Sequence, residues 1–76
     1  IRNKIGLRVK AIRGLKNISQ SDLAFFAGLD RSYLAGVENG KRNISVVNLE
    51  KIIAALECTL KDFFSDESFN EIEELK

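Results

Sequence analysis

The stretch from Ser19 to Asn43, SQSDLAFFAGLDRSYLAGVENGKRN, contains two short amphipathic runs joined by the four residues AGLD. Ser19, followed three positions later by an acid, predicts the start of a first helix, and Asp30 is expected to cap a second. Gly28 suits the left-handed end of the first helix, because a residue without Cβ takes a positive φ without penalty. A junction this short holds the two helices against each other at a fixed angle.

One amphipathic helix is expected before this stretch, over residues 2–15. Ile5, Val9 and Ile12 lie at i, i+4 and i+7 on one face of it. The six charged residues of segment 1–16 are all basic, and we expect most of them on the other faces. Such a segment can attract a polyanion, although a solvated helix face is the alternative.

Two more helices are expected after the stretch. Ser45 is expected to cap a helix whose apolar face consists of Leu49, Ile52, Ile53 and Leu56. Thr59 predicts the cap of a short fifth helix that contributes Leu60, Phe63 and Phe64. The sequence therefore predicts an all-α domain of five helices over residues 1–64.

The C-terminal end of the chain is acidic, in contrast to the basic segment 1–16. Residues 65–76 carry five acidic residues and one basic residue, so they form an acidic tail. Phe69, Ile72 and Leu75 lie at i, i+3 and i+6, and predict an additional C-terminal helix that is too short to be stable without a surface to pack on. At the other end, the chain starts at Ile1 and contains no Met, so we expect residues before Ile1 in the natural protein.

The composition excludes several classes of function. With one Cys and no His, the chain has no disulfide framework and no plausible zinc or iron site. It has no glycine-rich phosphate loop and no carboxylates at metal spacing, so we expect no enzyme, no cofactor and no small-molecule substrate. No apolar run approaches the roughly 20 residues that cross a bilayer, and no signal peptide is evident. We therefore expect a cytoplasmic protein without a membrane partner.

Two helices joined by a turn of about four residues that contains Gly form a helix-turn-helix. In this motif the second helix enters a DNA major groove with its first turn toward the base edges, while the first helix crosses the backbone. The first turn here, Arg31-Ser32-Tyr33, is polar, and it points outward because Leu34 and Val37 anchor the helix to the core. This pattern predicts binding to double-stranded DNA.

The same residues resemble the Cro/C1-type (XRE) helix-turn-helix family. The shared pattern consists of SQSDLA at 19–24, AGL at 27–29, VENG at 37–40, RNIS at 42–45, the pair Leu49 and Ile52, AL at 55–56 and LKDFF at 60–64. LDRSYLAGVE at 29–38, followed by Arg42-Asn43, is similar to the controller proteins of restriction-modification systems. One departure is Ile44, where many members have proline. The resemblance implies a compact lambda-repressor-like domain that acts as a transcriptional regulator.

The candidate DNA contacts begin with Arg31, which we interpret as the main base reader because Arg can pair bidentately with guanine O6 and N7. Ser32 either supports the helix cap or contacts a base or a phosphate. Tyr33 either packs its ring on the domain and offers its hydroxyl to the backbone, or contacts a base. The resemblance implies that Gln20 donates to a phosphate and braces the recognition helix. For Gln20 and Arg31, an ordinary surface side chain is the alternative.

The remaining candidates lie at the end of the recognition helix. Gly36 costs roughly 1 kcal/mol relative to Ala inside a helix, so we expect a close approach of DNA to explain it. Phosphate contacts are expected from the loop residues Asn39, Lys41, Arg42 and Asn43. Glu38 has the wrong charge for DNA, and the resemblance implies a structural ion pair with Arg13 that locks the recognition helix to the domain.

A homodimer is expected, because one recognition helix reads only a few base pairs and dimers bind two half-sites about 34 to 36 Å apart. A chain of 76 residues also buries only about 60% of its unfolded surface, which favours a partner subunit. The expected interface consists of Ile44, Val47, Leu60, Phe64, Phe69, Ile72 and Leu75. The alternative is that Leu60 and Phe63 fill the monomer core while the tail folds back over it.

The leading hypothesis is a sequence-specific regulator that binds a palindromic operator as a dimer, with RNA polymerase as a further candidate partner. Glu50 and Glu57 are candidates for that contact only because we expect them to be exposed. The alternative function is a protein-interaction module, such as an antitoxin or adaptor with the same fold, whose apolar tail binds a different protein.

Overall fold

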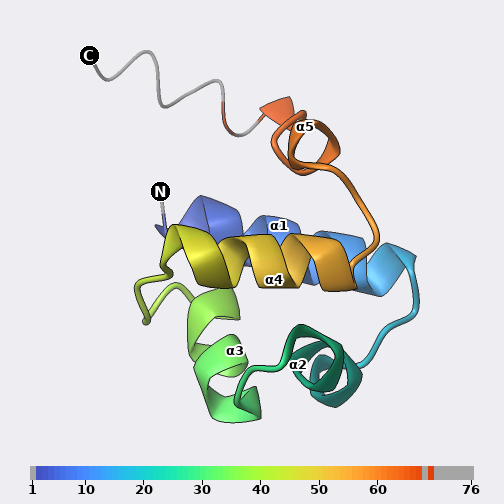
Figure 1. Cartoon of the computed structure of the whole chain (residues 1–76). Helices are drawn as coiled ribbons and strands as arrows, with labels where there is room; N and C mark the ends of the chain where they lie inside the picture. Colours follow the sequence, from blue (N-terminus) through green and yellow to red (C-terminus); the bar gives the residue numbers. More distant parts are fainter. Residues whose placement is uncertain (1, 68, 70–76) are drawn as a thin grey trace.

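The computed structural model describes residues 2–67 and 69, and these form a helical domain (Figure 1). The helices are α1 (Arg2–Leu15), α2 (Gln20–Ala27), α3 (Arg31–Glu38), α4 (Val46–Ala55) and α5 (Leu60–Phe63). The described residues contain no strand, and the prediction of an all-α domain of five helices is confirmed. Most of the helix predicted over residues 67–75 lies outside the described residues.

Hydroxyl side chains start three of the helices. The Oγ of Ser19 accepts the backbone N–H of Asp22 at 3.0 Å, and the Oγ of Ser45 accepts that of Asn48 at 3.1 Å. Thr59 starts α5 in the same way. The prediction that Asp30 caps α3 is right in position but wrong in its hydrogen bond, because the Asp30 carboxylate accepts the hydroxyl of Ser32 instead of a backbone N–H.

Helices α2 and α3 both end in a left-handed residue. Gly28 has φ of 69°, and the N–H of Leu29 donates to the carbonyl of Ala24 at 2.9 Å. Gly40 has φ of 73°, and the N–H of Lys41 donates to the carbonyl of Gly36 at 2.9 Å. Both are Schellman ends, which satisfy the last carbonyls of the helix and turn the chain sharply. The left-handed end that the sequence predicts at Gly28 is confirmed.

The core is formed by the apolar faces of all five helices. Its fully buried side chains include Val9, Leu23, Leu34, Leu56 and Phe63. Helix α3 packs on α1 and α2, and α2 also packs on α4 (Figure 1). Phe63 is therefore a core residue, whereas Leu60 remains 52% exposed and does not fill the monomer core.

Helix α1 approaches the end of α3 very closely at Gly6. A Cβ added there would overlap the carbonyl oxygen of Val37 and would lie 2.8 Å from that of Glu38. These are backbone atoms, so the helices would have to move apart to make room for a side chain. The small size of Gly6 therefore sets the distance between α1 and the recognition helix.

Helix α5 is fastened to α1 by Arg8. The guanidinium donates from Nε to the carbonyl of Phe63 at 2.7 Å and from Nη2 to that of Asp62 at 2.8 Å. A cation at the carboxyl end of a helix satisfies its last carbonyls and matches its dipole. This contact stabilises a helix of four residues that would not form alone.

We predict opposite effects for two glycine substitutions in α1. Gly6→Ala should lower the free energy of unfolding by about 1–3 kcal/mol, because the new methyl group forces α1 away from α3. Gly14→Ala should raise it by about 0.5–1 kcal/mol, because a Cβ at Gly14 meets nothing within 4 Å and Ala favours the helix. Urea unfolding followed by circular dichroism measures both. Equal changes in the free energy of unfolding for the two variants would contradict close packing at Gly6.

Candidate nucleic-acid interface

A buried carboxylate joins the first three helices. The side chain of Glu38 is almost inaccessible, with the residue 5% exposed, and it forms a bidentate ion pair with Arg13. The distances are 2.9 Å from Nε to Oε2 and 3.0 Å from Nη2 to Oε1. Arg13 also donates to the carbonyl of Ile18 at 3.1 Å. The hydrogen bond to Glu38 raises the pKa of the Arg13 guanidinium, which favours its charged form.

Gln20 completes this network from the first turn of α2. Its Nε2 donates to Oε1 of Glu38 at 3.1 Å. We call Arg13, Gln20 and Glu38 the helix lock, because it ties α1, the start of α2 and the end of α3 to one carboxylate. A carboxamide carries two N–H donors, so a contact with Glu38 is compatible with the predicted donation to a phosphate.

The first turn of α3 is placed as predicted, at the surface. Arg31 and Ser32 are exposed, and Leu34 behind them is fully buried. The Ser32 hydroxyl donates to Asp30, a contact at the helix start, and its contact with a base or a phosphate stays a prediction. Arg31 is left as the cationic side chain at the exposed tip of the helix.

Tyr33 is held by the polypeptide on three sides. Its hydroxyl donates to the backbone carbonyl of Asn43 at 3.2 Å and accepts from Nδ2 of Asn48 at 3.3 Å. The guanidinium carbon of Arg42 lies 5.1 Å from the ring centroid, a cation–π distance. In the unbound chain Tyr33 thus packs on the domain, in agreement with the first of its two interpretations.

Contacts within the chain explain why position 36 is a glycine, and the sequence did not indicate them. A Cβ at this position would overlap Cγ of Arg42 and would lie 3.3 Å from its Cβ. The Gly36 carbonyl also accepts the N–H groups of Lys41 and Arg42, at 2.9 and 3.2 Å. The missing side chain therefore lets the aliphatic stem of Arg42 lie across α3. A close approach of DNA at Gly36 stays a prediction.

The predicted DNA contacts lie around α3 and the loop that follows it. Asn39, Lys41, Arg42 and Asn43 are exposed, and the contacts of Tyr33 and Gly36 tie this loop to the helix. We define the reading surface as Gln20, Arg31, Ser32, Tyr33, Gly36, Asn39, Lys41, Arg42 and Asn43. Its three charged members are all cations, so it is suited to a polyanion.

The residues expected at a dimer interface differ in exposure. The most exposed apolar members are Val47, at 60%, and Leu60. Phe64 is 38% exposed, and its ring packs edge to face on that of Phe69, with centroids 4.9 Å apart. Ile44 is half-buried against the core, whereas Ile72 and Leu75 lie outside the described residues.

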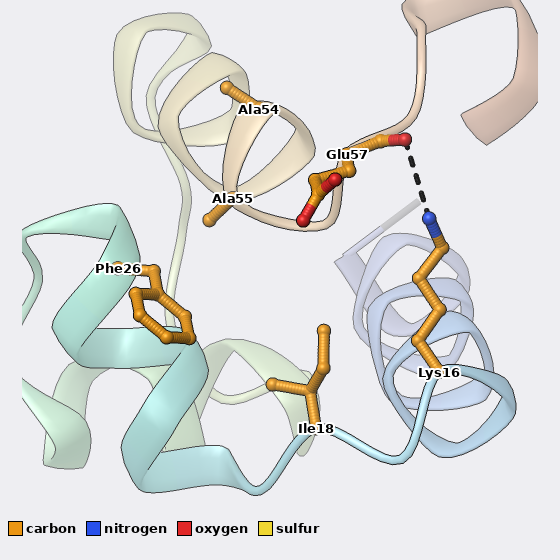
Figure 2. Close-up of a pocket in the computed structure, with 6 residues that line it drawn as sticks. All are labelled: Lys16, Ile18, Phe26, Ala54, Ala55 and Glu57. Atoms are coloured by element: carbon orange, nitrogen blue, oxygen red, sulfur yellow. Dashed lines mark hydrogen bonds between the residues drawn. The ribbon is translucent and has the colours of Figure 1, made fainter.

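A further apolar surface on α2 was missed by the sequence analysis. Phe25 and Phe26 are 80% and 63% exposed, and their rings meet edge to face with centroids 5.8 Å apart. Phe26 also lines an open pocket of about 520 Å³ at the end of α1, together with Lys16, Ile18, Ala54, Ala55 and Glu57 (Figure 2). No residue of the reading surface lines this pocket.

The lining of the pocket offers little chemistry. Lys16 donates from Nζ to the backbone carbonyl of Glu57 at 3.3 Å, the contact drawn as a dashed line in Figure 2.

Other features of the described residues bear on chemistry outside the pocket. Burial raises the pKa of the Cys58 thiol, which disfavours its thiolate form. Within residues 2–67 and 69, no three His, Cys, Asp or Glu side chains are arranged to hold a metal ion. None of the described helices is long and apolar enough to cross a bilayer.

The fold and this surface define a helix-turn-helix protein of the compact five-helix type. The chain belongs to the helix-turn-helix family HTH_3, whose model matches residues 9–63. This confirms the predicted resemblance to the Cro/C1-type (XRE) family.

Relatives of this chain include controller proteins of restriction-modification systems, as the resemblance indicated. The chain is 48% identical over 67 residues to the control protein C.MunI of a Mycoplasma species. This match covers 87% of this chain and 90% of that protein. The crystal structure of the restriction-modification controller C.AhdI from Aeromonas hydrophila is 46% identical, with a TM-score of 0.79 over 83% of this chain and 96% of the other. That of the controller C.Esp1396I is 37% identical, with a TM-score of 0.83 over 99% and 95%.

Removing the shared carboxylate should destabilise the fold strongly. We expect Glu38→Ala to lower the free energy of unfolding by about 2–4 kcal/mol, because it leaves a partly buried guanidinium and an amide without their acceptor. Glu38→Gln should cost less, since it keeps one acceptor oxygen. Chemical unfolding of both variants measures this. A value for Glu38→Ala within about 0.5 kcal/mol of the wild type would show that the helix lock contributes little.

Proposed function

We propose that this chain is a sequence-specific DNA-binding transcriptional regulator of the restriction-modification controller kind. The observation that carries the proposal is the exposed polar first turn of α3, held at a fixed angle to α1 and α2 by the helix lock. A rigid recognition helix is what base reading requires, because the contacts depend on the angle of insertion. The relative C.Esp1396I has been crystallised as a tetramer in complex with its natural 35 base-pair operator, which supports the same role here.

In the proposed complex the reading surface divides its work between bases and phosphates. Arg31 pairs with a guanine in the major groove, and Gln20 donates its second N–H to a phosphate at the start of α2. Lys41, Arg42 and Asn43 hold the phosphates on the other side of the recognition helix. The basic residues of α1 add long-range attraction. Binding and release of DNA make up the whole activity, and no catalytic step is proposed.

The regulator acts as a homodimer on a palindromic operator. Exposed apolar surface outside the helix-turn-helix is supplied by Val47 on α4, Leu60 on α5 and Phe64 directly after α5. Interfaces between identical subunits are self-complementary and apolar at their centres, which such side chains allow. The division of the chain into a DNA-binding part, residues 1–64, and a dimerising acidic tail, residues 65–76, belongs to this proposal.

A second candidate function is a protein-interaction module, and one observation favours it. Phe25 and Phe26 form an exposed aromatic pair outside the proposed dimer interface. An exposed aromatic pair of this kind is typical of protein interfaces. The exposed acids Glu50 and Glu57 are the proposed contacts for RNA polymerase, and a contact at Phe26 would adjoin Glu57 at the pocket.

Two substitutions separate base reading from phosphate binding. Arg31→Ala should weaken binding to the selected operator by about 1–3 kcal/mol and relax the preference at one base pair. Lys41→Ala should weaken binding to all sequences alike and reduce the slope of log K against log salt by about one. Fluorescence anisotropy with specific and scrambled duplexes at several salt concentrations measures both. A loss at Arg31 that is uniform across sequences would assign it to a phosphate.

A charge at Val47 should separate the subunits without unfolding them. Two Glu side chains near the two-fold axis repel each other, so Val47→Glu should weaken self-association by several kcal/mol, roughly 100-fold or more. Leu15→Glu is the matched control, because Leu15 is also an exposed apolar residue but lies outside the proposed interface. Sedimentation equilibrium gives the dissociation constants. A wild type that is monomeric at high micromolar concentration would overturn the dimer.

A further inference from the structure

We propose that Asn48 on α4 is a positioning residue for the reading surface, acting through Tyr33 on Arg42. This inference rests on the proposed function, because it assigns Asn48 a part in binding DNA through a phosphate contact of Arg42. Asn48 lies outside the helix-turn-helix, next to Val47 of the proposed dimer interface, and it belongs to neither set of predicted contact residues. Asn48 is connected to the reading surface by the hydrogen bond from its Nδ2 to the hydroxyl of Tyr33, at 3.3 Å.

The position of Asn48 is itself fixed. Its backbone N–H donates to Oγ of Ser45 at 3.1 Å, which makes it part of the cap of α4. Its side chain is half-buried, so its amide has a limited choice of partners. The amide group thus provides a stationary N–H donor beside the recognition helix.

The hydroxyl of Tyr33 requires such a donor. A phenol has one hydrogen to donate, and Tyr33 gives it to the carbonyl of Asn43. Its oxygen is then an acceptor, and the amide of Asn48 supplies the matching N–H. An Asp at this position could not donate to it. The two bonds hold the Tyr33 ring between α4 and the loop after α3.

The ring in turn holds Arg42. The guanidinium lies over its face, with Cζ 5.1 Å from the centroid, while the stem crosses the bare Cα of Gly36. Arg42 is exposed, and a long exposed side chain normally loses rotamer entropy when it binds. Contact on two sides restricts those rotamers before DNA arrives. Asn48 therefore preorganises Arg42 without touching DNA itself.

A double-mutant cycle tests this route. Asn48→Ala should weaken binding to the operator about three- to tenfold, the range expected for one side-chain hydrogen bond. In the Tyr33→Phe background, which lacks the hydroxyl, the same substitution should change the affinity less than about twofold. Equal losses in both backgrounds would mean that Asn48 acts on DNA or on the dimer directly, and would overturn the proposal.

The chain offers a second readout that needs no DNA. Tyr33 is the single tyrosine and there is no Trp, so the tyrosine bands in near-ultraviolet circular dichroism report on this residue. Asn48→Ala should weaken these bands while thermal unfolding stays close to that of the wild type. Lys51→Ala, an exposed site on the same helix, should leave them unchanged. Unchanged bands in Asn48→Ala would contradict a fixed Tyr33.

The outcomes separate this inference from the proposed function. If the wild type selects no DNA sequence, the proposed function fails and Asn48 has no reading surface to position. If the wild type selects a sequence and Asn48→Ala keeps the wild-type affinity for the operator, the inference alone fails. The proposal requires both a selective wild type and an effect of Asn48→Ala that disappears with the tyrosine hydroxyl.

Discussion

The geometry of this domain depends on the carboxylate of Glu38. A buried charge is stable only when it is paired and hydrogen-bonded, and Glu38 obtains its partners from Arg13 and Gln20. Because the partners lie on α1 and α2 while Glu38 ends α3, satisfying one carboxylate fixes the relative positions of three helices. An acid that looks unfavourable beside DNA is thus what holds the recognition helix in place.

Two glycines, which lack a side chain, determine the geometry of the domain as much as the ion pair does. Gly6 brings α1 against the carbonyls that end α3, and Gly36 makes room for the stem of Arg42. The helix lock and the contact at Gly6 act on the same end of the recognition helix, one by attraction and the other by close approach. Tyr33 then connects that helix to α4, next to the surface proposed for dimerisation. The surfaces proposed for base reading and for subunit pairing therefore share a small rigid scaffold.

Much of this architecture could be predicted from local sequence signals. Helix spacing, hydroxyl caps and the glycines at helix ends are determined within a few residues, so the helices and their boundaries were predicted correctly. Contacts between distant segments carry no such signal. The pairing of Gly36 with Arg42 and the approach at Gly6 depend on the three-dimensional packing, and Asp30 binds Ser32 through a competing local contact. The exposed pair of Phe25 and Phe26 was also not predicted, because no local signal in the sequence distinguishes an exposed Phe from one that packs on a neighbouring helix.

The central claim is that a rigid reading surface selects a DNA sequence as a symmetric pair. Selection of bound duplexes from a random DNA pool at two salt concentrations tests it most directly. The account predicts a two-fold symmetric motif that is recovered at both concentrations, with half-sites about one helical turn apart or a multiple of it. Weak recovery of unrelated sequences that disappears at the higher salt concentration would contradict it, since it would reduce the basic surface to general attraction for a polyanion.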